Sequence, residues 1–180
     1  MTDIAEHAQA AATRRYSGLM IAIHWITALL VVAAWFTAEG GRHVRADPPL
    51  LHFTLGFAVL LLLLPRLIAR WTGGTPRAED PQGGWMELAA RTGHWTLYAL
   101  LIAMPLTGWY AASRLGVTVS FLGIALPSLT APVEGYPGLI AELHQNGGNL
   151  LLILAGLHGL IALWHQFWLK DGTLSRMNPL

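Results

Sequence analysis

The sequence predicts an all-α fold, an integral membrane bundle of four helices, and three observations carry that prediction. Of the 180 residues, 54% are hydrophobic and only 12% are charged, about half the charged fraction of a soluble domain. The apolar residues gather into four long runs, and each run supplies the ~20 residues that a helix needs to cross a bilayer. Segments rich in glycine, proline and charged residues separate the runs, as loops between spans do.

The first two expected spans occupy the N-terminal half of the chain. Residues 1–13 carry two acidic residues and lack the basic segment of a cleaved signal, so we expect a disordered cytoplasmic tail. The first span covers about residues 18–38 and follows two consecutive arginines. The second covers about residues 50–69 and contains Pro65, which a membrane helix tolerates as a kink.

The last two expected spans flank the longest loop. The third span covers about residues 85–112, and the fourth covers about residues 141–169. In the loop between them, the apolar segment 117–126 is too short to span a membrane, and we interpret it as a lid at the membrane interface. Residues 14–177 therefore form one four-helix transmembrane domain, without a soluble domain or an internal repeat.

The positive charges predict the orientation of these spans. Eight of the eleven Lys and Arg residues fall on the side of both termini and the second-to-third loop, and three fall on the other side. By the positive-inside rule, both termini lie in the cytoplasm. The eight are Arg14, Arg15, Arg66, Arg70, Arg77, Arg91, Lys170 and Arg176, and the three are Arg42, Arg45 and Arg114.

Composition excludes several kinds of chemistry. The chain has no cysteine, which removes disulfides, iron–sulfur clusters, thiolate-ligated haem and covalent haem attachment. A formal net charge of +1 is too small to indicate a nucleic-acid partner. Eight histidines in so apolar a chain remain as the residues able to carry chemistry.

Two of these histidines lie on one face of the fourth span. His144 and His158 are fourteen residues apart, nearly four whole helical turns, so both rings project from almost the same face. They lie about 21 Å apart along the axis, most of the ~30 Å hydrocarbon core. Because imidazoles are costly in lipid, the pair indicates two cofactor sites, one near each membrane surface.

Each of the two has a possible partner at equal depth on another span. A haem iron held by protein alone takes two axial ligands from opposite sides. His52 begins the second span on the outer side, as His144 does in the fourth. On the inner side, His24 is nine residues past Arg15 and His158 is twelve before Lys170, which corresponds to roughly 14 and 18 Å. Depth therefore pairs His52 with His144 and His24 with His158.

Intramembrane histidines also admit other interpretations. A single intramembrane histidine can form an interhelical hydrogen bond or belong to a proton path. A zinc site would need about four ligands at one depth, often with carboxylates, whereas these histidines split between two depths and the span interiors are essentially free of Asp and Glu. A non-haem proton or metal transporter remains an alternative function.

The remaining histidines carry weaker expectations. His165 is seven residues after His158, on the same face at the inner interface, where it can hydrogen-bond a quinone carbonyl or simply sit beside neighbouring tryptophans. His94 is expected to contact a haem propionate or to pack, because it is shallow. His43 and His7 are expected to be solvated.

Several short motifs follow one another along residues 14–177. They are Arg15-Tyr16-Ser17, Ile23-His24-Trp25, His52 with Gly56, Gly93-His94, Pro105 with Gly108, Glu142-Leu143-His144, Gly156-Leu157-His158 and the run KDGTLSRM from Lys170 to Met177. In this order they resemble the bacterial cytochrome b561 family, four-helix di-haem membrane cytochromes linked to quinone. The resemblance implies that His24, His52, His144 and His158 are the axial ligands of two haems b in a bacterial inner membrane.

The resemblance also implies an oxidoreductase function. Members similar to this chain pass electrons between haem and the quinone pool, and some oxidise superoxide at the periplasmic face while reducing ubiquinone. The outer residues Arg42, Arg45 and Arg114 can steer such an anion. Arg14, Arg15 and Arg91 are candidates for contacts with haem propionates or, more simply, lipid phosphates.

The alternative within the same family is a membrane-anchoring electron conduit. In that case the chain would serve a separate dehydrogenase or a soluble haem protein, its redox partner. The absence of a catalytic domain from the sequence does not separate the two.

Overall fold

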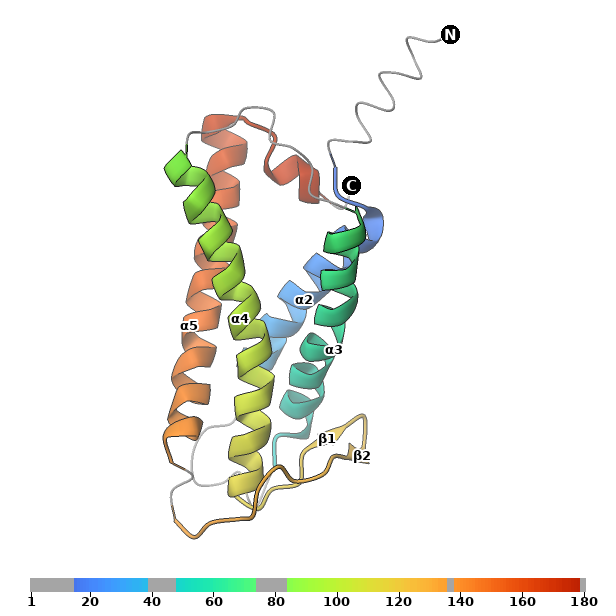
Figure 1. Ribbon diagram of the computed structural model, residues 1–180, viewed down its shortest axis with the longest axis vertical. Coiled ribbons are helices and arrows are strands. Elements are labelled where there is room, and N and C mark those ends of the chain that lie inside the picture. The colour runs from blue at the N-terminus through green and yellow to red at the C-terminus, as the bar shows by residue number, and fades with distance from the viewer. Residues whose placement is uncertain (1–14, 39–47, 74–83, 136–137, 179–180) are drawn as a thin grey trace.

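The computed structural model describes residues 15–38, 48–73, 84–135 and 138–178, and four long helices dominate them. The helices run up and down in sequence order, so that the first and last described residues lie at the same end of the bundle (Figure 1). This confirms the expected all-α, four-helix membrane bundle. The helices are α2 (Gly18–Phe36), α3 (Leu50–Gly73), α4 (Gly84–Arg114) and α5 (Leu139–Trp164).

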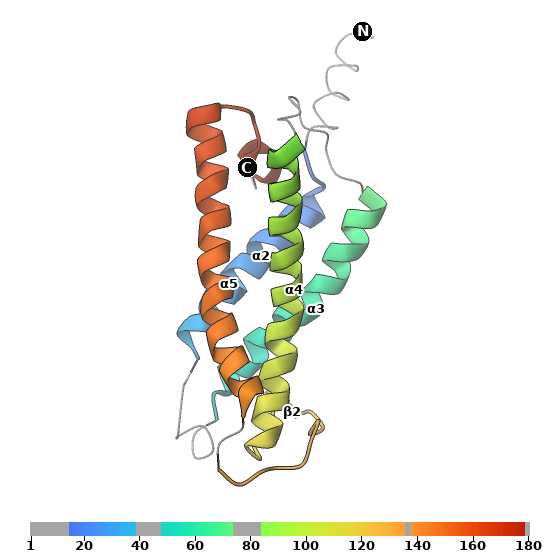
Figure 2. The same ribbon diagram turned by 60° about the vertical axis from the view of Figure 1, so that its left-hand side comes forward.

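We call the end of the bundle that holds the described termini the terminal end, and the opposite end the hairpin end. α2 packs mainly on α3, and α4 mainly on α5. Figure 2 shows α4 and α5 running side by side along the length of the bundle. A buried cluster joins α3, α4 and α5 midway along the bundle, with Val59, Leu63, Tyr98, Leu101 and Leu151 as its members.

Three of the helices are long and apolar enough to cross a membrane. They are Gly18–Phe36, Leu50–Thr72 and the continuous segment Leu139–Leu169. α4 has 31 residues, which is ample length, but His, Trp, Tyr and Thr side chains lower its hydropathy. Large apolar side chains face outward along the bundle, as a lipid-facing surface requires.

The loop at the hairpin end folds as a small β-hairpin. Strands β1 (Ser120–Phe121) and β2 (Ile124–Ala125) pair antiparallel, with Phe121 opposite Ile124. Leu122 and Gly123 between them both have positive φ, as a two-residue turn of type I′ requires. The segment expected as an interfacial lid thus contains a hairpin, and its buried side chains pack on the ends of α3 and α4.

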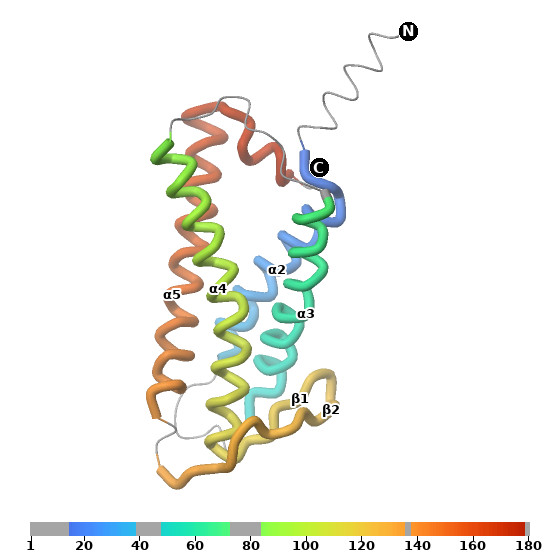
Figure 3. Tube along the Cα trace, viewed as in Figure 1, coloured from blue at the N-terminus to red at the C-terminus, as the bar shows by residue number. Residues whose placement is uncertain are grey.

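The chain after α5 folds back across the terminal end (Figure 3). α5 continues into a π-helical turn, η1 (His165–Leu169), and Lys170 then takes a left-handed conformation with φ 54° that reverses the chain. The 3-10 turn η2 (Leu174–Met177) follows. The Trp25 indole N–H donates to the Met177 carbonyl at 2.8 Å, which ties this segment to α2.

Candidate functional site

The bundle interior brings four histidines together as two pairs at two levels. Near the hairpin end, the ring centroids of His52 on α3 and His144 on α5 lie 5.9 Å apart. Nearer the terminal end, those of His24 on α2 and His158 on α5 lie 6.3 Å apart. All four side chains are partly buried. These are the two pairs expected from depth.

The pair near the hairpin end is oriented by backbone carbonyls. Nδ1 of His52 lies 2.8 Å from the Ala34 carbonyl oxygen, and Nδ1 of His144 lies 3.0 Å from the Met104 carbonyl oxygen. A carbonyl can only accept, so each Nδ1 carries its hydrogen and donates it. The Nε2 atom of each neutral ring therefore keeps a lone pair, which is the usual state of a metal-binding histidine.

Glycines set the close approach of α4 and α5 at this level. A Cβ on Gly108 would lie 2.6 Å from Cε1 of His144, and a Cβ on Gly147 would lie 2.5 Å from the terminal methyl of Met104. By contrast, a Cβ on Gly56 or Gly148 would meet nothing within 4 Å. The flexible end of Met104 can move aside, whereas the ring of His144 is held in place, so among these four glycines Gly108 is the one that the packing of α4 against α5 needs. The space beside Gly56 and Gly148 is open.

The pair nearer the terminal end has a third histidine beside it. His94 on α4 faces His158 with a centroid distance of 5.3 Å, which is shorter than the distance from His24 to His158. The sequence placed His94 near this level only as a packing or propionate-contacting residue. In the structure, His158 lies between two imidazoles from two different helices.

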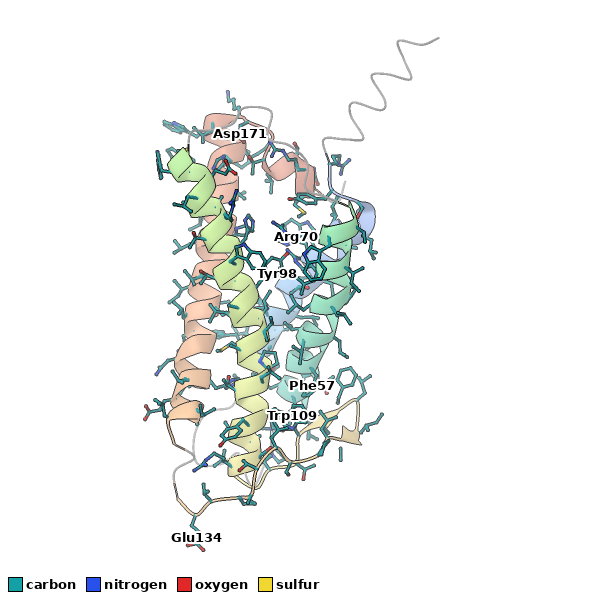
Figure 4. The ribbon with its side chains drawn as sticks, viewed as in Figure 1. Phe57, Arg70, Tyr98, Trp109, Glu134 and Asp171 are labelled. Atoms are coloured by element: carbon teal, nitrogen blue, oxygen red, sulfur yellow. The ribbon has the colours of Figure 1, made fainter. Side chains whose placement is uncertain are left out.

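An arginine from α3 also enters this level. Nη2 of Arg66 lies 3.1 Å from Nδ1 of His24, and Nε of Arg66 donates to the Tyr98 hydroxyl at 3.2 Å. The guanidinium groups of Arg66 and Arg70 lie 5.5 and 6.0 Å from the centroid of the Tyr98 ring. Figure 4 shows Arg70 and Tyr98 facing the same interior region, from α3 and α4.

These interior arginines were not recognised as site residues from the sequence. In the sequence, both count only among the positive charges that predict orientation. The available signal was the position of Arg66 directly after a leucine-rich run and Pro65, still within the apolar segment. An arginine at such a depth more often faces the bundle interior than lipid.

His165 is held by a carboxylate from the returning chain. Its Nδ1 lies 2.5 Å from Oδ2 of Asp171, and the Thr173 backbone N–H donates to Oδ1 at 3.0 Å. Burial raises the pKa of Asp171, but the hydrogen bonds from His165 and Thr173 outweigh it and hold the pKa below its ordinary value. The carboxylate is therefore ionised at neutral pH, and the His165 ring donates from Nδ1.

The expected arginine contacts are described only in part. Arg91 pairs with Glu87 at 2.8 Å on the surface of α4, with 65% of its side chain exposed, so it lies apart from the histidines. The Arg15 guanidinium donates to the Asn178 carbonyl. Arg114 closes α4 at the hairpin end, with its Nε buried. Arg14, Arg42, Arg45, His7 and His43 lie outside the described residues.

The sequence of this chain is similar to those of known proteins. Residues 15–179 match the family model described as prokaryotic cytochrome b561. The chain is 32% identical over 170 residues to a protein from Yersinia pestis named probable superoxide oxidase CybB, covering 92% of this chain and 97% of that protein. It is 30% identical over 173 residues to cytochrome b561 homolog 1 of Escherichia coli, with coverage of 92% and 97%.

Proposed function

The chain belongs to the prokaryotic cytochrome b561 family, and from this premise we propose that it carries electrons across a bacterial inner membrane between two haems b and the quinone pool. Membership supports membrane electron transfer by a haem protein. The number of haems, their ligands and the quinone are the finer parts of the proposal. The proposed axial ligands are His52 with His144, and His24 with His158.

The spacing of the two histidine pairs is the observation that carries this proposal. An imidazole nitrogen binds a first-row metal at about 2 Å, so two rings on opposite sides of one iron have centroids roughly 6 Å apart. The observed separations are 5.9 and 6.3 Å. Near the hairpin end, the rings already donate from Nδ1 to carbonyls, which leaves both Nε2 atoms available to iron. The residues present therefore fit a bis-histidine haem.

A haem b held by either histidine pair would supply one-electron transfer, and the two histidines would occupy the iron so that substrate would not bind to it. The chain supplies two such levels on one helix, about 21 Å apart along the axis. α5 contributes one proposed ligand to each site, His144 and His158. The terminal end of the bundle is the cytoplasmic end in this proposal.

His165 is the proposed contact for quinone at the cytoplasmic face. Asp171 accepts from Nδ1 and so fixes the ring with Nε2 directed elsewhere. In its protonated form, Nε2–H can donate to a quinone carbonyl oxygen and then pass it a proton. Reduction of one quinone to quinol consumes two electrons and two protons, so a protonatable group at this face suits the chemistry.

Superoxide is the proposed electron donor at the periplasmic face. The name of the Yersinia pestis relative suggests this substrate, and Arg114 at the hairpin end offers a positive charge that attracts an anion. A haem held by His52 and His144 would take one electron from each superoxide, which would leave as O₂. Two superoxide ions thus supply the two electrons that reduce one quinone to quinol. The two protons of the quinol are taken up at the opposite, cytoplasmic face.

The test uses the purified protein alone, followed by its haem absorption bands. We expect superoxide to reduce the haem and a ubiquinone analogue to reoxidise it. Arg114→Gln should slow the reduction at low ionic strength, and added salt should reduce the difference, because salt screens the long-range attraction between superoxide and a protein charge. Arg91→Gln, at the opposite end and on the surface, is the matched control and should leave the rate unchanged.

Two results would overturn parts of the proposal. If the haem responds only to a co-purifying protein, the chain is an electron conduit for that partner rather than a superoxide-linked enzyme. If the purified protein has no Soret band when expressed with sufficient haem, the haem assignment itself is wrong and a proton or metal transporter becomes the better interpretation.

A further inference from the structure

We propose that Arg66 and Arg70, supported by Tyr98, bind the carboxylate groups of the haem at the terminal end of the bundle. This inference rests on the proposed function, because it requires a haem between His24 and His158. It concerns different residues, however, and its consequences can be measured while both histidine pairs remain intact.

The first argument is that these two cations lack a counter-ion. Both side chains are partly buried on the inner part of α3. Among the described residues, the ion pairs join Arg91 to Glu87 and His165 to Asp171, so neither Arg66 nor Arg70 pairs with a described carboxylate. A guanidinium at membrane depth is costly unless an anion or several acceptors satisfy it. The site therefore requires an anion that the described protein does not supply.

The second argument comes from the tautomer of His24. Arg66 donates, so the observed 3.1 Å contact requires a lone pair on Nδ1 of His24. A neutral histidine that binds iron through Nε2 carries its hydrogen on Nδ1 and cannot accept there. Once iron is bound in this way, Arg66 keeps the Tyr98 hydroxyl as its described acceptor and has further N–H groups to satisfy. A carboxylate accepts two parallel N–H bonds from one guanidinium.

The third argument is the shape of the cationic site. Arg66 and Arg70 are four residues apart and so lie on one face of α3, about 6 Å apart along the axis. Tyr98 is only 7% exposed, and its ring lies beneath both guanidinium groups, where the negative π face attracts them. The two charges extend from the His24 level toward the terminal end. A haem has two carboxylates on one edge, and this row offers one arginine to each.

The positive charges of Arg66 and Arg70 should affect how easily the nearby haem is reduced, and this can be measured. Positive groups beside a haem favour its reduced form, because reduction adds one negative charge. Removal of one arginine should therefore lower the equilibrium constant for reduction of this haem, and leave the haem between His52 and His144 unaffected. A tenfold change corresponds to about 59 mV for one electron.

The experiment is an optical redox titration of the purified holoprotein, with the haem content measured in parallel. Arg66→Gln and Arg70→Gln should each lower the reduction equilibrium constant of one haem by roughly tenfold, or release that haem alone. Arg66→Lys should recover most of the effect, since it keeps the charge and loses only the bidentate contact. Arg91→Gln is the matched control, because it also removes one arginine charge at the terminal end, and both haems should titrate as in the parent.

A second variant identifies the haem that responds. His24→Ala is expected to keep only the haem near the hairpin end, and adding Arg66→Gln to it should leave the titration of that haem unchanged. Arg70→Gln is less liable to misfold than Arg66→Gln, because Arg70 makes a ring contact but no hydrogen bond in the described structure. A change in this variant therefore reflects the lost charge. If both Gln variants keep two haems with parental titrations, this inference is wrong while the proposed function stands. If the parent binds no haem, the proposed function fails first.

Discussion

Replacement of Gly108 by alanine should weaken one haem site and spare the other. Its added Cβ would lie 2.6 Å from Cε1 and 3.0 Å from Nδ1 of His144, whereas ordinary contact begins at 3.4 Å. The ring is held by its hydrogen bond to Met104, so it can retreat only by breaking that bond. We therefore expect Gly108→Ala to displace a proposed iron ligand without touching the other three.

The magnitude follows from the cost of overpacking. Such insertions cost about 1–3 kcal/mol, and each 1.4 kcal/mol is tenfold in affinity. The affinity for the haem between His52 and His144 should fall roughly fivefold to 150-fold. Haem-to-protein ratio after exposure to a haem-accepting protein measures this loss, and the optical spectrum shows which haem remains.

Gly93→Ala is the matched control for this prediction. Gly93 lies on the same helix, and its added Cβ would meet nothing within 4 Å. Alanine should leave both haems in place and stabilise α4 by roughly 0.5–1 kcal/mol. Should Gly108→Ala keep both haems as firmly as Gly93→Ala does, the packing argument at this level would be refuted.

Three further predictions concern the two ends of the bundle. Asp171→Asn should slow reoxidation by a ubiquinone analogue and leave both haem spectra intact, because it removes the carboxylate that orients His165; an unchanged rate would contradict this role. The Asp171 carboxylate has a lowered pKa, so it stabilises the folded protein above its unfolded pKa of 3.8, and this stabilisation is lost as pH falls through the lower folded value. Acid unfolding of Asp171→Asn that is identical to that of the parent would argue against this contribution. Ser113→Ala should destabilise the hairpin end by about 1–3 kcal/mol in thermal unfolding, because Ser113 is 1% exposed, donates to the Trp109 carbonyl and accepts from Leu129 N–H; a stability equal to that of the parent would show that these bonds contribute nothing.

The bundle and the two histidine levels could be predicted from the sequence because they depend on fixed quantities. A membrane span needs a set number of apolar residues, and helical rise converts sequence separation into depth. Depth alone was enough to bring His52 to His144 and His24 to His158. Depth assigned the shallower His94 to packing or to a propionate contact, whereas in the structure its ring lies closer to His158 than the ring of His24 does.

Other features depend on contacts that periodicity does not encode. Arg66 has a long side chain that can turn inward or toward the interface, so its position in the sequence did not reveal its contact with Tyr98. The contact of Asp171 with His165 requires the chain reversal at Lys170. The sequence does not reveal the hairpin, because Leu122 adopts positive φ, a conformation that leucine rarely takes.

The most direct test of the account is the haem content and absorption spectrum of the four single histidine variants, measured beside the parent and His94→Ala. We predict two haems b per chain in the parent and in His94→Ala. His52→Ala and His144→Ala should each retain the same single haem, and His24→Ala and His158→Ala should each retain the other. A crossed pattern among these variants, or loss of a haem from His94→Ala with none from His24→Ala, would contradict the pairing on which the mechanism rests.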